Sequence, residues 1–312
     1  MNKPYALGID IGGTNTAFGL VAQDGSILFK ENISTRNFLT PQELVDKIYD
    51  VVISYSDLKL IQGIAIGAPN GNHFTGEIVN APNLIWKGRI PLAKLFEDKF
   101  NIKSQLTNDA NAAAIGEHLF GNAKDLKDFV SITLGTGLGS GIFIDGKIVN
   151  GNQGYAGEYG HICVIQDGRL CGCGRKGCLE TYASSTGVVR SYNVLESIHK
   201  SQSSLKQYEE VTAKLIFKEA KDGDLFANEI VDLTAHILGK SLADFACFSN
   251  PKAFVLFGGI AQSGIFFAEK VKQQMENHLL NILKDNIEIR ISGLHDKNAA
   301  VLGGAATVFL EQ

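Results

Sequence analysis

The sequence predicts an α/β fold with mixed sheets, and three observations support this class. Short apolar segments rich in β-branched residues alternate with longer amphipathic segments along all 312 residues, which indicates layered strands and helices. Some successive strands are separated only by a tight glycine turn and others by a helix, so antiparallel and parallel pairs must coexist. No linker rich in proline, serine or charge divides the chain, so a domain boundary is expected to be a hinge.

The expected elements follow from the period of the apolar residues, and the chain is long enough for two ordinary domains. Strands are predicted at Tyr5–Ile9, Ala17–Val21, Ile61–Ile66, Phe129–Leu134, Ser140–Ile144, Ala253–Phe257 and Ile287–Ile291. Helices are predicted at Thr40–Tyr55, Pro91–Phe100, Ala110–Phe120, Val211–Glu219, Leu225–Phe248 and Ser263–Leu283.

Composition excludes several classes of partner. The net charge is −4 and the basic residues form no long cluster, which argues against nucleic acid or an anionic membrane as the main partner. No apolar run reaches membrane-spanning length and no signal peptide precedes the first strand. The expected location is therefore the cytoplasm, where thiols stay reduced.

A metal site is indicated by one histidine and three cysteines in a glycine-rich run, namely His161, Cys171, Cys173 and Cys178. Four soft ligands suit a closed tetrahedral zinc site, which stabilises rather than catalyses. The glycines between them are expected to supply positive φ angles that let a short loop wrap the ion. The alternative is a pair of disulfides, although three cysteines cannot all pair. The remaining Cys163 and Cys247 lie in apolar stretches and are expected to be buried thiols.

Two carboxylates flank this run. Glu158 precedes His161 and Glu180 follows Cys178. A loop stiffened by a metal can present fixed polar groups to a small polar substrate. The alternative is that both carboxylates are merely solvated loop residues.

Glycine turns in both halves predict a phosphate site. Each is a strand, a glycine turn with a threonine, and a returning strand, and together they contain Gly12, Gly13, Thr14, Asn15, Gly135, Thr136 and Gly137. Backbone N–H groups at such turns can approach an anion closely. Asp10, at the end of the first strand, could hold Mg²⁺ through water. A third turn, Gly258-Gly259, could let an adenosine moiety pass close to the backbone. A single turn of this kind would more often be an ordinary hairpin.

Other nucleotide signatures fail. After Gly135 and Gly137 the third position of a dinucleotide fingerprint is Ser140, and a strand follows instead of a helix. Gly239-Lys-Ser241 resembles the end of a P-loop, but Thr234 stands where the first glycine should be.

With these motifs in place, the chain resembles the ROK sugar kinases, bacterial glucokinases above all. The resemblance is carried by Asp10-Ile-Gly-Gly-Thr14, Asn108-Asp-Ala-Asn-Ala-Ala113, Leu134-Gly-Thr-Gly-Leu-Gly139, Gly157-Glu-Tyr-Gly-His161 and the run from Cys171 to Glu180. It implies two ribonuclease-H-like domains of the actin and hexokinase type around a central cleft. The implied domains are residues 1–120 plus 298–312, with the final helix returning to the first domain, and residues 121–297, which carry the zinc loop 161–178.

The resemblance also implies an activity. ATP would phosphorylate a sugar hydroxyl, with the 6-hydroxyl of glucose the leading candidate, and Asp109 matches the family's catalytic base. By itself, a helix N-cap would be the commoner explanation for Asn108 and Asp109. N-acetylmannosamine, N-acetylglucosamine, fructose or allose could replace glucose, and polyphosphate could replace ATP. A non-catalytic sugar sensor is the runner-up, although the repressors of this family carry an N-terminal helix-turn-helix for which no room is expected before Asp10.

By motif match, the sugar contacts implied are Asn83, Asn108, Asp109, Glu158, His161 and Glu180. His161 would then bind zinc through one ring nitrogen and a sugar hydroxyl through the other. Trp86 is expected to pack beside the cleft.

The chain departs from the family pattern in two places. Many members have lysine at the position of Asn15, and the usual G-x-P-G-P-V segment reads Gly67-Ala-Pro-Asn-Gly-Asn72 here. The resemblance suggests a homodimer or homotetramer.

Overall fold

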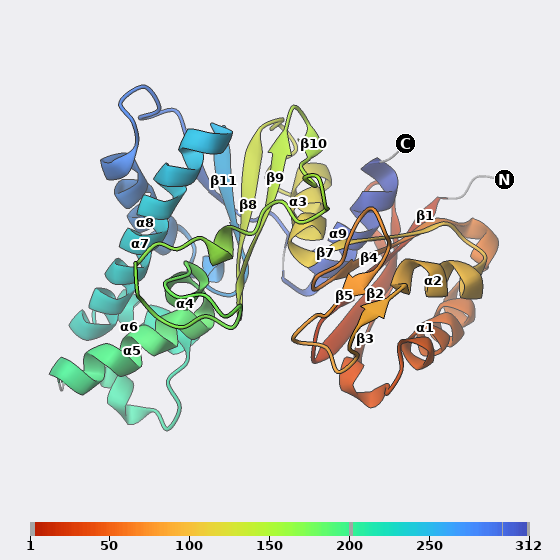
Figure 1. Ribbon diagram of the computed structural model, residues 1–312, viewed down its shortest axis with the longest axis horizontal. Helices are drawn as coiled ribbons and strands as arrows, with labels where there is room; N and C mark the ends of the chain where they lie inside the picture. The colour runs from red at the N-terminus through yellow and green to blue at the C-terminus, as the bar shows by residue number, and fades with distance from the viewer. Residues whose placement is uncertain (1–3, 200–201, 295, 311–312) are drawn as a thin grey trace. The chain divides into compact units, whose positions relative to one another are not determined.

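The computed structural model describes residues 4–199, 202–294 and 296–310, and the chain forms two compact units. Unit 1 consists of Met1–Asp125, Ile148–Ala156 and Gly293–Gln312. Unit 2 consists of Leu126–Lys147 and Gly157–Ser292. Each unit contains one five-stranded sheet (Figure 1).

The sheet of unit 1 has the order β3-β2-β1-β4-β7. Its strands are β1 (Tyr5–Ile11), β2 (Asn15–Ala22), β3 (Ile27–Ser34), β4 (Ile61–Ala68) and β7 (Ser104–Asn108). The first three form an antiparallel meander, whereas β4 and β7 run parallel to β1. The central strands are buried almost throughout, because helices cover both faces of the sheet.

The helices of unit 1 are α1 (Pro41–Tyr55), α2 (Leu92–Phe100), α3 (Asp109–Leu119) and α9 (Asp296–Leu310), beside a small ribbon of β5 (Ile78–Val79) and β6 (Arg89–Ile90). Helix α1 begins with a capping box between Thr40 and Glu43 and has Pro41 in its first turn. Helix α9 packs on α3, β1 and β4. The last helix of the chain therefore completes unit 1.

The sheet of unit 2 has the order β10-β9-β8-β11-β12. Its strands are β8 (Phe129–Leu134), β9 (Leu138–Ile144), β10 (Lys147–Ile148), β11 (Ala253–Phe257) and β12 (Glu288–Ile291). Strands β8 and β9 are antiparallel, and β11 pairs in parallel with both β8 and β12.

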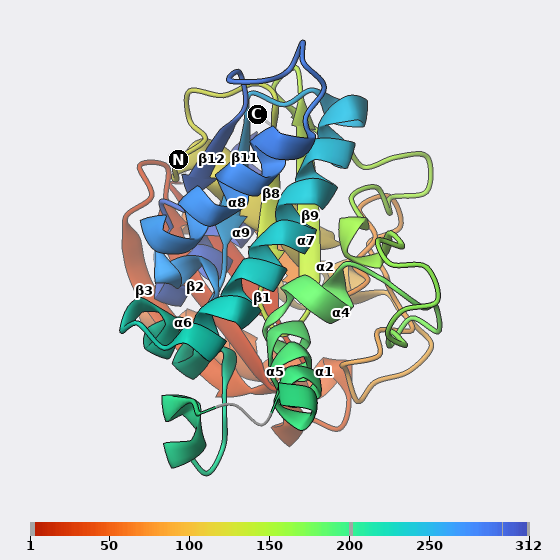
Figure 2. The same ribbon diagram turned by 90° about the vertical axis from the view of Figure 1, so that its left-hand side faces the viewer.

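The helices of unit 2 are α4 (Glu180–Ala183), α5 (Ser185–His199), α6 (Ala213–Lys221), α7 (Leu225–Ser249) and α8 (Ile265–His278). Helices α7 and α8 lie side by side (Figure 2). Single turns of 3₁₀ helix occur at Thr35–Asn37, Leu58–Leu60, Tyr159–His161, Ser204–Gln207 and Ala261–Ser263.

The mixed α/β class is confirmed, and all seven predicted strands are present. The predicted helix Ser263–Leu283 is too long: α8 starts only after Gly264, whose φ of +74° breaks the helix, and it ends before the extended Leu279. Strands β3 and β7 and helix α5 were not predicted, because their polar residues mask the apolar period. In the described part of the chain, no helix is long and apolar enough to cross a membrane.

Candidate active site

Two acidic side chains meet at the carboxyl edge of the unit 1 sheet. Asp10 is in register with Gly67 of β4, and Gly67 is in register with Thr107 of β7. The neighbouring parallel strands therefore bring Asp10 to the same edge as the start of α3. A Cβ atom added at Gly67 would lie 3.6 Å from Asp10 Oδ1 and 3.7 Å from Asp109 Cα. Sheets of this kind bind ligands at this edge.

Asn108 and Asp109 have different structural roles at the start of α3. Asn108 is the N-cap, and its Oδ1 accepts hydrogen bonds from the N–H groups of Ala110 (2.7 Å) and Asn111 (3.4 Å). Asp109 is the first helical residue, and its Oδ1 accepts a second hydrogen bond from Ala110 N at 2.8 Å. The cap therefore belongs to Asn108, whose amide nitrogen is not used in capping.

The environment of the two carboxylates raises their pKa values. Burial and, to a smaller extent, the negative charge of Asp109 raise the pKa of Asp10 from 3.8 to about 7. Desolvation raises the pKa of Asp109 against the opposing effect of the hydrogen bond from Ala110. Asp109 remains exposed, so the protein atoms around it displace water without closing off the carboxylate. Neighbouring carboxylates with raised pKa values suit proton acceptance or cation binding.

The first glycine turn joins β1 to β2. Gly12 N donates to Asn15 O at 2.9 Å and closes the turn, while Thr14 O accepts from Thr35 N at 2.9 Å. A Cβ atom at Gly13 would lie 2.3 Å from Asn83 O. Only glycine lets the Asn83 backbone approach this closely. Unit 1 thus gathers Asn83 at the turn that carries Asp10.

The second glycine turn joins β8 to β9 and is tied to Glu180. Gly135 N donates to Gly137 O at 3.1 Å within the turn. Glu180 Oε2 accepts from Leu138 N at 3.0 Å, and a Cβ atom at Gly137 would lie 2.5 Å from the same oxygen. Cys171 Sγ donates to Glu180 Oε1 at 3.6 Å. Glu180 therefore connects the turn to the cysteine loop, a link that sequence reasoning did not predict.

The third turn lies at the same sheet edge as the second, because β11 is the parallel neighbour of β8. Gly258 has a φ of +101°, and Ile260 N donates to Leu134 O at 3.4 Å. Thr136 O accepts a hydrogen bond from the Thr186 hydroxyl at 3.0 Å. The hydroxyl of Thr133, just before the second turn, is buried without a hydrogen-bond partner.

The predicted metal ligands come together. One ligand atom from each of His161, Cys171, Cys173 and Cys178 lies within 4.8 Å of every other. A tetrahedral zinc ion would space its sulfur ligands about 3.8 Å apart, and the sulfurs of Cys173 and Cys178 are separated by 3.7 Å. The structure carries these four residues in an arrangement that fits the ion. Gly174 and Gly177 have φ angles of +87° and +75°, as the sequence predicted, whereas Gly172 does not have a positive φ.

The two ring nitrogens of His161 face different groups. Its Nδ1 lies 3.6 Å from Cys171 Sγ, on the ligand side, and its Nε2 lies 3.8 Å from Glu158 Oε2. Burial raises the pKa of Cys171 to about 12 and raises the pKa of Cys178. A bound cation would be needed to keep both sulfurs as thiolates.

The other cysteines require a correction. All five cysteines lie in the described residues and are free thiols, so the disulfide alternative is not realised. Cys163 and Cys247 are exposed, contrary to the expectation of buried thiols, because an apolar sequence neighbourhood does not determine which side of the backbone a thiol occupies. Trp86 is buried within unit 1, where its indole nitrogen donates to Phe38 O at 3.0 Å.

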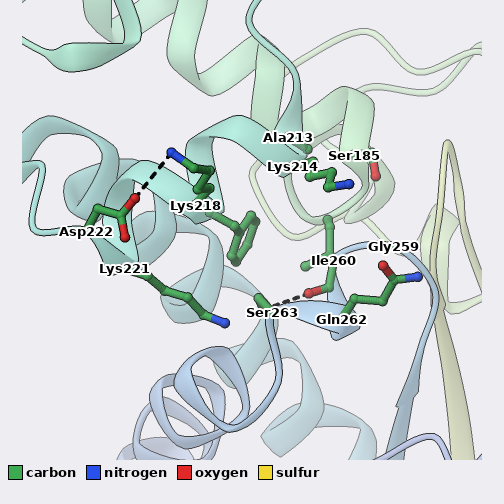
Figure 3. Close-up of a pocket in the computed structure, with 11 residues that line it drawn as sticks. Ser185, Ala213, Lys214, Lys218, Lys221, Asp222, Gly259, Ile260, Gln262 and Ser263 are labelled. Atoms are coloured by element: carbon green, nitrogen blue, oxygen red, sulfur yellow. Dashed lines mark hydrogen bonds and ion pairs between the residues drawn. The ribbon is translucent and has the colours of Figure 1, made fainter.

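A pocket of about 350 Å³ opens in unit 2 beside the third glycine turn (Figure 3). Its lining comes from α6, the start of α5 and the turn after β11, and comprises Ser185, Ala213, Lys214, Phe217, Lys218, Lys221, Asp222, Gly259, Ile260, Gln262 and Ser263. The volume is in the range of small-molecule sites. Lys218 is paired with Asp222 at 3.3 Å. Sequence reasoning missed the three lysines, although their spacing of four and three residues places them on one helical face.

The comparisons with known proteins agree on the family. The sequence matches the ROK family over residues 6–311. A glucokinase of Halalkalibacterium halodurans is 35% identical over 97% of this chain and 94% of the relative. A xylose repressor of Caldicellulosiruptor bescii is 29% identical over 97% of this chain and 77% of the relative.

A solved structure gives the same answer. A ROK family glucokinase from Streptomyces griseus in complex with glucose and AMPPNP has a TM-score of 0.82 and 32% identity, covering 97% of this chain and 98% of that one. Sequence and fold thus correspond over nearly the whole length. The chain belongs to the ROK family and is similar to its bacterial glucokinases.

Proposed function

We propose that the protein is an ATP-dependent hexose kinase that phosphorylates the 6-hydroxyl of glucose, with Asp109 as the general base. The observation that carries the proposal is the helix start at α3, where Asn108 provides the N-cap and leaves Asp109 exposed beside Asp10. The glucokinase relatives, one of them bound to glucose and AMPPNP, support the same activity.

In the proposed reaction, the sugar 6-oxygen attacks the γ-phosphorus and the bond from that phosphorus to the β-phosphate oxygen breaks. The hydroxyl proton passes to the Asp109 carboxylate, and ADP leaves. Burial raises the pKa of Asp109 above the usual aspartate range, which makes its carboxylate a better proton acceptor.

Sugar recognition is assigned to the six residues that match the family motifs. Asn83, Asn108 and Asp109 belong to unit 1, and Glu158, His161 and Glu180 belong to unit 2. The amide nitrogen of Asn108 would donate to a hydroxyl, since its oxygen caps α3. His161 would use Nε2, because Nδ1 faces the metal ligands. A site that pairs each hydroxyl rejects analogues that lack one.

Nucleotide binding is assigned to the glycine turns and to the pocket of unit 2. The N–H groups of Gly12 and Gly135 are used within their own turns, so the phosphates would be held by the turn residues that follow them. Adenosine would occupy the pocket beside Gly259. The lysines that line this pocket would then lie near the phosphates. When bound, Mg²⁺ would neutralise phosphate charge, and Asp10 is the carboxylate that would hold it, directly or through water.

The zinc ion is assigned a structural role. Four protein ligands leave no open position for water, and no step of phosphoryl transfer needs the ion. Its effect would pass along the chain from Cys178 to Glu180, which follows that ligand by two residues and accepts a hydrogen bond from Leu138 N in the second glycine turn.

The proposal is tested by ADP release with Mg·ATP and a panel of glucose, fructose, mannose, allose, N-acetylglucosamine and N-acetylmannosamine. A reaction without sugar and the Asp109→Asn variant provide the blanks. Asp98→Asn, which changes an exposed carboxylate on α2, is the matched control.

Turnover on glucose well above that on the other sugars would support the whole proposal. Preference for another sugar would keep the mechanism and refute the specificity. If zinc-loaded protein released no ADP with any sugar of the panel but turned over with polyphosphate, ATP would be refuted as the donor. If neither ATP nor polyphosphate supported turnover although glucose bound measurably, a sugar sensor would be favoured.

A further inference from the structure

We propose that Cys163 is a redox modification site. Hydrogen peroxide oxidises its exposed thiol, which then forms a disulfide with Cys178 and removes that residue from the metal. The two cysteines are direct partners in a short antiparallel bridge. Cys178 is one of the four residues that can hold the ion. The inference rests on zinc occupying this cluster and does not depend on which sugar is phosphorylated.

The register of the bridge suits a disulfide. Val164 N donates to Gly177 O at 2.8 Å and Leu179 N donates to Ile162 O at 3.0 Å. These two bonds flank the cysteine pair, which is therefore a non-hydrogen-bonded pair with side chains on the same face. Cα atoms in such pairs are about 4.5 Å apart, within the range of about 4.4–6.8 Å found for disulfides. The bond can close with little backbone movement.

Exposure decides which sulfur reacts first. Cys163 is exposed, whereas Cys178 is fully buried. Cys173 is exposed too, but it is one of the four residues that can hold the ion. The Cys163 thiol makes one long contact, to Ile165 O at 3.6 Å, and it is not among the metal ligands. Peroxide can therefore reach Cys163 without displacing the ion.

The chemistry balances in two steps. In the first, the Cys163 sulfur attacks peroxide, the O–O bond breaks, and the products are a sulfenic acid and water; the sulfur loses two electrons, which the peroxide gains. In the second, the thiolate of Cys178 attacks the Cys163 sulfur, the S–S bond forms, the S–O bond breaks, and hydroxide takes up a proton to become water. The metal is left with three protein ligands and binds more weakly.

The loss would reach the substrate-binding residues through the loop. Cys178 lies two residues before Glu180, and its backbone O accepts the hydroxyl of Thr181 at 2.8 Å. Withdrawal of Cys178 from the ion loosens the segment that holds Glu180 against Leu138 N. Peroxide would thereby lower sugar affinity reversibly, and a dithiol with added zinc would restore it.

Peptide mapping tests the proposal directly. Zinc-loaded protein is treated with peroxide, alkylated and digested with trypsin, which cleaves after Arg169, Arg175 and Lys176. The cysteines of interest then fall in three separate peptides, residues 148–169, 170–175 and 177–190. The expected product joins peptide 148–169 to peptide 177–190. Zinc release is followed in parallel with a chromogenic chelator.

Two variants complete the test. Cys163→Ser should release zinc severalfold more slowly than the wild type, while Cys247→Ser, which removes the other exposed thiol outside the cluster, should match the wild type. Equal zinc content before oxidation shows that both variants fold. A wild-type product joining peptides 170–175 and 177–190 would mean that Cys178 pairs with another ligand, Cys171 or Cys173, instead of with Cys163, and would overturn the proposal. Unchanged zinc release in Cys163→Ser would overturn it as well.

Discussion

The two units share one sheet topology and place different chemistry at the same edge. Each has three strands that are consecutive in the chain, next to two further strands that are parallel to the central strand, and each carries a glycine turn after the central strand of its sheet. Two residues before the turn glycine, unit 1 has Asp10 and unit 2 has Thr133. Topology therefore sets where the turn lies, and the side chain ahead of it sets whether that edge is acidic.

The difference has electrostatic consequences. In unit 1, the two carboxylates of Asp10 and Asp109 favour binding of a proton or a cation between them. The pKa of Asp10, raised to about 7 by burial and by the charge of Asp109, reflects this. In unit 2, the corresponding hydroxyl of Thr133 is buried without a partner, and the nearby pocket is lined by three lysines. One edge suits general base chemistry and metal binding, and the other suits a polyanion.

The largest expected effect would separate the two units by stability. Removing zinc from the loaded protein with a chelator should destabilise unit 2, because the binding free energy of a structural zinc ion, about 10–16 kcal/mol in zinc-finger peptides, is also folding free energy. Trp86, the single tryptophan, is buried in unit 1, so its fluorescence transition should not move. Thermal melts followed by circular dichroism and by fluorescence, with and without chelator, make the comparison. A fall of equal size in both signals would refute the assignment to unit 2 alone.

The next effect concerns the acidic edge. Asp109→Asn should lower kcat by about 10²–10⁴, because the proton of the attacking hydroxyl loses its acceptor, while glucose affinity stays close to normal. Steady-state kinetics and calorimetric glucose binding measure the two quantities. Asp98→Asn, on the exposed face of α2, should change neither. Near-normal turnover in Asp109→Asn would refute the role of Asp109 as general base.

A smaller effect tests the raised pKa of Asp10. Its carboxyl has a pKa of about 7 in the folded protein and a reference value of 3.8, so between these values the folded state binds more protons than the unfolded state. Stability should therefore decrease as pH rises through this window, by up to about 1.4 kcal/mol per pH unit. Asp10→Asn should reduce this slope in urea unfolding without Mg²⁺, leaving the part that comes from the raised pKa of Asp109. An unchanged slope would show that another group titrates.

The smallest effect contrasts the two glycine turns. A Cβ atom at Gly137 meets the end of the flexible Glu180 side chain at 2.5 Å, whereas one at Gly13 meets the Asn83 backbone at 2.3 Å. Gly137→Ala should cost about 1.5–3 kcal/mol, the range for a hydrogen bond to a charged group, seen as a higher KM for sugar. Gly13→Ala should cost more, because a backbone segment must move. Gly135→Ala, where the nearest atom is 4.0 Å away, is the control.

Local patterns explain what the sequence predicted well. The period of apolar residues marked β1, β8 and β11, because each is short, apolar and bounded by glycine. The metal ligands were found because cysteine and histidine rarely cluster in a short run for another reason. The edge strand β3 and the polar strand β7 were not predicted. Their place in the sheet depends on pairing with other strands more than on their own residues.

The sequence by itself determined the α/β class, the glycine turns, the histidine and cysteine cluster and the family, because each depends on residue type at short spacing. Tertiary structure alone decided that segment 148–156 belongs to unit 1, that Glu180 links the second turn to the metal loop, and that α6 lines a pocket with lysines. It also decided that Cys163 is exposed and faces Cys178. These features depend on contacts between residues far apart in the chain or across a backbone pairing, and short sequence spacing does not encode which side chains meet there.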